Sequence, residues 1–266
     1  MKDKVVIITG GSSGIGLACA LEFQRQGAKV VISGRDAAKL QAAAKPGMLA
    51  IPGDVSSEAD CKHLIEQTLQ HFGRIDILIN NAGISMRSVF KDTHLDVLRK
   101  LMDINFWGTV YCTKYAMPEL LRNKGSVVGI SSIAGKMGLP ARTGYSASKF
   151  AMEGFLETIR TEHLHDGLHV LVVCPGFTAS NIRNTALSHD GTQQGESPRD
   201  EQKMMSAEEV AKHIASAVLS RKRDLVLTTE GKLAVWVRKF MPAFIDTQIF
   251  NKMKREKDSP LNHHNK

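Results

Sequence analysis

The amino-acid sequence predicts a single α/β domain built on a parallel β-sheet with helices on both faces. Short, almost wholly apolar runs rich in Val and Ile alternate along the chain with longer segments of helical periodicity. Strands of a parallel sheet that is covered on both faces are apolar throughout, whereas strands with one wet face alternate. The 266 residues, 42% of them hydrophobic and 23% charged, suit one such domain with a core that needs no disulfides.

Each element follows from a local pattern. Apolar runs predict strands at residues 4–9, 29–33, 48–55, 75–81, 126–132 and 168–176. Helical spacing predicts helices from the glycine-rich turn after the first strand to about Gly27, and at residues 58–73, 94–121, 145–165 and 205–220. The last of these has Ser206 at its start and Glu209 three positions later, the pattern of a capping box.

The chain has no visible linker and no internal repeat. We therefore expect one domain over residues 1–230, followed by a basic, amphipathic C-terminal extension over residues 231–266. The polar stretch 188–203 is too short to separate two domains and predicts a surface loop, of the kind that often covers a binding site.

Positive charge is concentrated near the C-terminus. The formal net charge is +8, and residues 221–257 carry ten Lys or Arg against four Asp or Glu, which gives +6 in this segment. A local patch without a stacking motif does not indicate a nucleic-acid-binding protein. The four cysteines are far apart and the histidines are scattered, so no metal site is expected. No apolar stretch approaches the ~20 residues of a membrane-spanning helix and no leader is apparent, which predicts a cytoplasmic protein.

The stretch TGGSSGIG at residues 9–16 lies between a predicted strand and a predicted helix. Gly10, Gly14 and Gly16 would let the backbone turn sharply and approach a phosphate, while the helix N-terminus offers free N–H groups and a positive dipole end. The Lys-Ser/Thr pair of a nucleoside-triphosphate loop is missing. Glycines that serve only helix–strand packing are the alternative, and the strand–turn–helix context makes it the weaker one.

The end of the second predicted strand should decide which dinucleotide is bound. An acid at this point bonds a ribose 2′-hydroxyl, whereas an Arg accommodates a 2′-phosphate. The sequence places Gly34 where the acid is expected and Arg35 directly after it, which favours NADP(H) over NAD(H). If the strand ends two residues later, Asp36 becomes the ribose ligand instead.

Six motifs together resemble those of the short-chain dehydrogenases/reductases. They are TGGSSGIG, NNAG at residues 80–83, INFWG with its asparagine, ISS at residues 130–132, YSASK at residues 145–149 and PG at residues 175–176. The likeness covers about residues 3–220, which makes residues 1–230 the catalytic domain. It implies a Rossmann-type, doubly wound sheet of seven parallel strands, NAD(P) binding, and homodimers or homotetramers. It also implies a catalytic tetrad of Asn105, Ser132, Tyr145 and Lys149, with Ser132 preferred over Ser131 because it stands thirteen positions before the tyrosine.

The same resemblance implies the residues that contact the cofactor. They are Gly10, Ser12, Ser13, Gly14, Ile15, Gly16, Arg35, Asp54, Val55, Asn81, Ala82, Gly83, Tyr145, Lys149, Pro175, Gly176, Thr178 and Ser180. Ser180 departs from the family, which often has Thr five positions after the proline, and Thr178 is the neighbouring candidate. Asp54 matches an adenine-contacting aspartate, although a turn or capping role would explain it nearly as well.

The tetrad suits the reduction of a carbonyl, which needs a hydride on carbon and a proton on oxygen. Tyr145 would donate the proton, and the ammonium of Lys149, one helical turn away, would lower the pKa of the phenol. Ser132 would donate a hydrogen bond to the substrate oxygen. By resemblance, Asn105 bends its helix and holds a water near Lys149. The sequence thus predicts an NADPH-dependent oxidoreductase acting on an apolar ketone or secondary alcohol; the alternative is a catalytically idle NADP-binding regulatory or membrane-surface protein.

The segment 231–257 departs from a compact catalytic domain. Trp236, Phe240, Phe244 and Phe250 stand among basic residues, and Pro242 should break a single helix here. Such a segment could make peripheral contact with a membrane. The favoured alternative is that its apolar residues cover the substrate cleft or a partner subunit. The segment is similar to that of the hydroxysteroid dehydrogenase-like branch, which would fit a lipophilic substrate.

Overall fold

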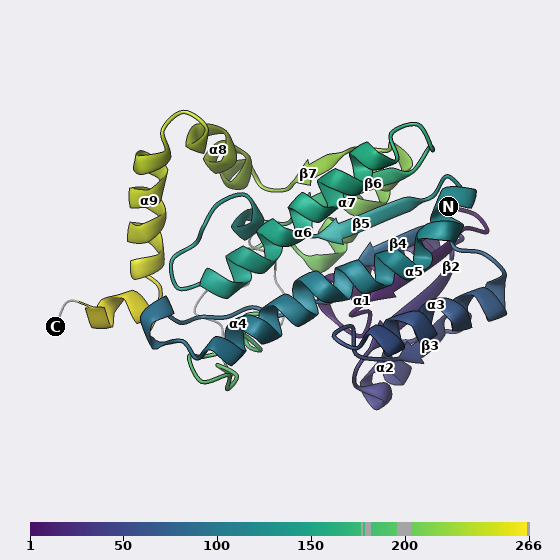
Figure 1. Ribbon diagram of the computed structural model, residues 1–266, viewed down its shortest axis with the longest axis horizontal. Helices are drawn as coiled ribbons and strands as arrows, with labels where there is room; N and C mark the ends of the chain where they lie inside the picture. Colours follow the sequence, from purple (N-terminus) through teal and green to yellow (C-terminus); the bar gives the residue numbers. More distant parts are fainter. Residues whose placement is uncertain (177, 179–181, 196–203, 265–266) are drawn as a thin grey trace.

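A computed structural model describes residues 1–176, 178, 182–195 and 204–264 of the chain, and its sheet has seven parallel strands in the order β3-β2-β1-β4-β5-β6-β7. The strands are β1 (Val5–Thr9), β2 (Lys29–Gly34), β3 (Leu49–Pro52), β4 (Ile77–Asn80), β5 (Ser126–Ile130), β6 (His169–Cys174) and β7 (Asp224–Val226). The chain starts at β1 in the interior, moves outward to β3, and returns to place β4 on the other side of β1 (Figure 1). This reversal confirms the predicted doubly wound, Rossmann-type sheet.

Helices cover both faces of the sheet. The bounds of the principal helices are α1 (Gly14–Arg25), α2 (Ala37–Ala43), α3 (Glu58–Phe72), α4 (Leu95–Met102), α5 (Gly108–Arg122), α6 (Thr143–Glu162), α7 (Ala207–Leu219), α8 (Thr229–Arg238) and α9 (Pro242–Lys254). Short 3₁₀ turns lie at Phe90–Asp92, Ile133–Gly135 and Pro260–His264.

The two faces of the sheet have separate apolar cores. Val6 and Ile8 of β1 pack in the core that contains α1 and α7, while Ile7 between them packs in the core that contains α3, α5 and α6. Both faces of the strand are therefore buried, which explains why the strand sequences are apolar throughout. All four cysteines are free and buried.

Several predicted elements end earlier than expected, and the shortening affects the site. The strand predicted at 126–132 ends at Ile130, and that predicted at 168–176 ends at Cys174. The motif residues after each strand thus lie in turns at the carboxyl edge of the sheet. The helix predicted at 94–121 contains a π-helical turn, Asp103–Trp107, between α4 and α5. Such turns often mark functional positions in helices.

The C-terminal segment forms a helical hairpin at one end of the molecule (Figure 1). Pro242 stands at the first position of α9, so the predicted break divides α8 from α9. No helix in the described parts of the chain is both long and apolar enough to cross a membrane.

Candidate active site

A cleft of about 770 Å³ opens along the carboxyl edge of the sheet. Of the residues predicted to form the site, the following line it: Gly10, Ser12, Ser13, Gly14, Ile15, Arg35, Asp54, Val55, Asn81, Ala82, Gly83, Ser132, Tyr145, Lys149, Pro175, Gly176 and Thr178. Gly16 and Asn105 stand behind the lining, and Ser180 lies outside the described residues. Residues from turns after six different strands therefore meet in one cavity.

The glycine turn at one end of the cleft has no room for larger residues. Gly10 and Gly14 adopt φ of +64° and +54°, which L side chains rarely tolerate. A Cβ on Gly16 would lie 2.2 Å from the carbonyl oxygen of Gly10. Asn81 holds the turn from the neighbouring strand, since its Nδ2 donates to the carbonyl oxygen of Thr9 at 2.9 Å.

The helix that follows this turn is not capped by a side chain. Ser13 is the N-cap of α1, and its side chain makes no capping hydrogen bond. The first N–H groups of the helix therefore face a cleft lined by glycine backbone. This arrangement fits a dinucleotide pyrophosphate, which accepts hydrogen bonds from such groups.

The turn after β2 separates the roles of Arg35 and Asp36. Asp36 is the N-cap of α2, and its Oδ1 accepts a hydrogen bond from the Lys39 backbone N–H at 2.9 Å. The guanidinium of Arg35 is more than half exposed in the cleft, with NH1 4.0 Å from Oδ2 of Asp54. Arg35 and Asp36 both line the cleft, and one oxygen of the Asp36 carboxylate is engaged in the helix cap.

Asp54 has the local role that the sequence left open. Its Oδ1 accepts hydrogen bonds from the backbone N–H and the hydroxyl of Ser56, at 2.9 and 2.8 Å. The side chain therefore stabilises the turn after β3, and it also lines the cleft.

Asn105 stands in the π-helical turn and connects two parts of the site. Its Oδ1 accepts from the backbone N–H of Ile84 at 2.8 Å, and its Nδ2 donates to the Ser148 hydroxyl at 2.9 Å. Ser148 in turn donates to the carbonyl oxygen of Tyr145 at 2.9 Å. Asn105 is fully buried and so fixes the turn after β4 to the first turns of α6.

Lys149 is a buried cation next to the phenol ring of Tyr145. Its Nζ lies 5.9 Å from the centroid of that ring and donates to the carbonyl oxygen of Ile130 at 2.8 Å. Burial lowers the pKa of Lys149 to about 8, against an opposing effect of Glu153. A Cβ on Gly83 would lie 3.4 Å from Nζ and 3.0 Å from Oδ1 of Asn105, so a glycine leaves this space open.

The pKa of Tyr145 differs from the sequence-based expectation. Burial raises the pKa of the phenol above its ordinary value, although a hydrogen bond with Ser132 and the positive charges of Arg142 and Arg183 oppose this. The prediction that the pKa of Tyr145 is lowered is therefore wrong for the protein without cofactor. Burying a phenolate costs more free energy than these three groups offset.

The two serines of the ISS motif have different partners. Ser131 donates a hydrogen bond of 2.5 Å to Oε1 of the buried Glu153, whose Oε2 lies 2.6 Å from Nζ of Lys136. Both serines line the cleft, and Ser132 accepts from the backbone N–H of Ala134 at 3.2 Å and acts to lower the pKa of the Tyr145 phenol. Ser131 is thus engaged with Glu153, and Ser132 is the serine beside the phenol.

Among the cleft-lining residues that sequence reasoning missed are Arg142, Arg183, Met253 and Glu256. The carboxylate of Glu256 is almost fully buried, 3.8 Å from NH2 of Arg142 and 3.7 Å from Nε of Arg87. Met253 is buried at the end of α9. Met253 and Glu256 of the C-terminal segment therefore contribute to the wall of the cleft, whereas Trp236, Phe240, Phe244 and Phe250 do not line it. No local sequence pattern in residues 251–257 predicts that these residues line the cleft.

The chain belongs to the short-chain dehydrogenase family, whose family model, described as short chain dehydrogenase, matches residues 4–191. It is therefore an oxidoreductase of the dehydrogenase/reductase type. The comparison agrees with the motifs and the order of the strands.

Individual relatives differ in how much of the chain they match. The chain is 35% identical to a mouse protein named dehydrogenase/reductase SDR family member 7B, over 97% of this chain and 84% of that one. It is 42% identical to an Arabidopsis thaliana protein named 11-beta-hydroxysteroid dehydrogenase-like 2, over 67% of this chain and 60% of that one. An alcohol dehydrogenase from Thermococcus sibiricus, solved in complex with 5-hydroxy-NADP, has the same fold, with a TM-score of 0.75 at 20% identity over 85% of this chain and 96% of that one.

Proposed function

We propose that this protein is an NADP(H)-preferring oxidoreductase that reduces a carbonyl, or oxidises a secondary alcohol, of an apolar small molecule. The observation that carries the proposal is the placement of Ser132, Tyr145 and Lys149 in the same cleft as the uncapped glycine turn. One part of the cleft has the features of a dinucleotide site, and another has a proton donor beside a buried cation.

The roles of the side chains follow from their surroundings. Bound NADPH would supply the hydride. Because the pKa of Tyr145 is raised by burial, the phenol is protonated at neutral pH and is ready to donate its proton to a substrate oxygen. Ser132 adjoins this phenol and would donate a hydrogen bond to the same oxygen as negative charge develops there.

Lys149 and Asn105 would support this step in different ways. With a pKa of about 8, Lys149 is mainly charged at pH 7, and its ammonium stabilises the phenolate that remains after proton transfer. Asn105 would act as a positioning residue, because its hydrogen bonds to Ile84 and Ser148 fix the loop and the helix that flank the cation.

The preference for NADP(H) rests on the turn after β2. Arg35 lies at the cleft with its guanidinium partly exposed, whereas Asp36 is engaged as the cap of α2. A guanidinium favours a 2′-phosphate, and the cap of α2 engages one of the two Asp36 oxygens that could accept from a ribose hydroxyl.

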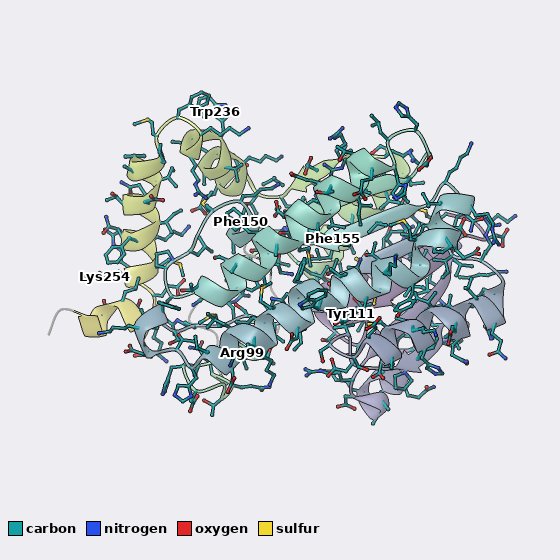
Figure 2. All side chains as sticks on the ribbon, in the orientation of Figure 1. Arg99, Tyr111, Phe150, Phe155, Trp236 and Lys254 are labelled. Atoms are coloured by element: carbon teal, nitrogen blue, oxygen red, sulfur yellow. The ribbon has the colours of Figure 1, made fainter. Side chains whose placement is uncertain are left out.

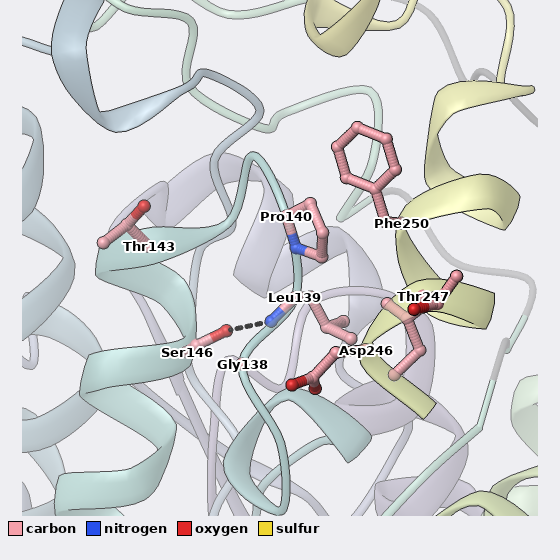
Figure 3. A pocket seen from close by; sticks show the side chains of 9 residues that line it. Gly138, Leu139, Pro140, Thr143, Ser146, Asp246, Thr247 and Phe250 are labelled. Carbon is pink, nitrogen blue, oxygen red and sulfur yellow. Dashed lines mark hydrogen bonds between the residues drawn. The ribbon is translucent and has the colours of Figure 1, made fainter. Parts of the chain in front are cut away.

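The surroundings of the cleft support an apolar substrate. Leu139, which lines the cleft, also lines an adjoining cavity of about 650 Å³ between the loop before α6 and the helix α9. Pro140 and Phe250 approach this cavity from opposite sides, and a hydrogen bond from the Leu139 backbone N–H to the Ser146 hydroxyl holds the loop (Figure 3). The Arabidopsis thaliana relative is named as like a hydroxysteroid dehydrogenase, which agrees with an apolar substrate.

A screen of NADPH oxidation over steroid, sphingoid, acyl and quinone ketones tests the proposal. We expect turnover with at least one apolar class, and we expect NADPH to be preferred to NADH. Tight NADPH binding without turnover on any of these classes would favour the idle cofactor-binding alternative.

A further inference from the structure

The hairpin of α8 and α9 exposes a group of large apolar side chains. Between 49% and 70% of each side chain's residue surface is accessible at Leu233, Trp236, Phe240, Met241 and Phe244, and we call these five residues the apolar tip. The rings of Trp236 and Phe240 lie 5.3 Å apart. Figure 2 shows Trp236 projecting outward at the end of the hairpin. Single exposed apolar residues are ordinary, but five on one hairpin, two of them with neighbouring rings, indicate an interaction surface.

The charged residues within the stretch that carries the apolar tip are all positive. Residues 231–245 contain Lys232, Arg238 and Lys239 and no acidic residue, and both lysines are exposed. The acids that flank this stretch are engaged or turned away from it: Glu230 pairs with Lys252, and Asp246 lines the cavity between α9 and the loop before α6 (Figure 3). The surface therefore combines aromatic rings with uncompensated lysine charge.

We propose that the apolar tip docks on the surface of a lipid bilayer that carries anionic lipids. Trp and Phe side chains enter the boundary between headgroups and acyl chains, while lysines beside them are attracted to anionic headgroups. Both halves of this chemistry are present within residues 232–244.

A second copy of the chain is a poorer occupant of the same surface. A two-fold contact would place the same patch on both sides of the interface. Because residues 231–245 hold three cations and no acid, the contact would bring like charges together. An anionic lipid surface has the opposite charge and no such conflict.

Docking at the apolar tip would also orient the cleft. The helix α9 starts beside the tip and carries Met253, which lines the cleft, near its other end, and Ile249 and Phe250 between them border the adjoining cavity. The single helix α9 would thus connect the bilayer surface to the cleft, and an apolar substrate dissolved in the bilayer would reach the mouth of the cleft along it. This consequence rests on the proposed function, whereas the docking itself does not.

Co-sedimentation with lipid vesicles tests the docking directly. The full-length protein is mixed with vesicles of phosphatidylcholine alone, and with vesicles that also contain phosphatidylserine. We expect binding to the second kind and weak or no binding to the first. Since each lysine near an anionic surface contributes about fivefold in partitioning, K232Q/K239Q should lose more than about tenfold on anionic vesicles. W236A/F240A should lose at least about tenfold, because it removes two aromatic anchors.

Matched variants elsewhere on the surface serve as controls. L164A/L219A removes two equally exposed apolar side chains outside the tip, and K2Q/K45Q removes two exposed lysines near the other end of the sheet. Both controls should bind vesicles as the unmodified protein does, and thermal denaturation should show that all four variants fold. Absence of binding to anionic vesicles, or equal losses in the controls, overturns the proposal. The proposal is also overturned if light scattering shows that W236A/F240A dissociates an oligomer in the absence of lipid, since the tip would then be covered by a second copy.

Discussion

Replacing Lys149 by methionine is expected to stabilise the fold at neutral pH, although it removes a residue that the proposed chemistry requires. The ammonium of Lys149 is buried, and its pKa lies at about 8 instead of 10.5. Since a tenfold change in proton affinity corresponds to about 1.4 kcal/mol, keeping this lysine charged in the fold costs roughly 3 kcal/mol. The variant also loses the hydrogen bond to the Ile130 carbonyl, which is worth about 1 kcal/mol. The unfolding free energy at pH 7 should therefore rise by about 2 kcal/mol.

The effect should depend on pH in a defined direction. The pKa of Lys149 is lower in the folded chain than in the unfolded chain, so the cost is fully present below about pH 8. As the pH rises from about 8 toward 10.5, the folded lysine loses its proton and the unmodified protein gains stability. Urea denaturation of both proteins at pH 7 and pH 10 measures this, and most of the advantage of the variant should be gone at pH 10.

Lys136 provides the matched control. Burial lowers its pKa, but the hydrogen bond and charge of Glu153 outweigh this and hold the pKa above its ordinary value. Its stabilising effect is therefore fully present at pH 7 and is lost only as the pH rises through that raised pKa. Lys136→Met leaves the carboxylate of Glu153 buried without this partner and should cost about 3 kcal/mol at pH 7. A loss of stability in Lys149→Met at pH 7, similar to that in Lys136→Met, would refute the reasoning.

Three further predictions concern the cleft. Arg35→Ala should raise KM for NADPH at least about tenfold and leave KM for NADH nearly unchanged, because only the former has a 2′-phosphate; equal effects would remove the basis for the NADP(H) preference. Gly16→Ala should lower the unfolding free energy by about 2 kcal/mol and weaken NADPH binding, since its Cβ would meet the Gly10 carbonyl at 2.2 Å. The control Gly154→Ala on α6 has no atom within 4 Å of the new Cβ, so it should be neutral or slightly stabilising. Glu256→Gln should raise KM for the carbonyl substrate about fivefold without changing KM for NADPH. The substitution weakens the ion pairs with Arg87 and Arg142, which hold the C-terminal segment against the cleft. An equal change in both constants would show that these ion pairs do not act at the substrate end.

The parts of the fold that could be predicted have strong local patterns. The run from Val5 to Thr9 is buried on both faces, and the glycines after it have conformations or contacts that other residues cannot adopt. Such features can be recognised directly from the residue types in the sequence. The short helix α2 and the strand β7 were not predicted from their own patterns, because Asp224–Val226 has only three residues and is defined by pairing with β6.

The missed parts of the site depend on contacts between distant segments. Glu256 meets Arg87 and Arg142 only because α9 returns the chain to the cleft, and nothing in its neighbourhood in the sequence distinguishes it from a surface acid. The pKa of Tyr145 was likewise mispredicted, because spacing on a helix shows which residues are neighbours but not how deeply the phenol is buried.

The central claim is that Tyr145 donates the proton in a reaction for which the rest of the cleft binds the cofactor. The most direct test is Tyr145→Phe, measured for NADPH oxidation with a ketone that the unmodified protein reduces and, separately, for NADPH binding by fluorescence titration. We predict a fall in kcat of at least about a thousandfold with a dissociation constant for NADPH within about twofold of the original. Turnover that survives the loss of the hydroxyl would contradict the claim.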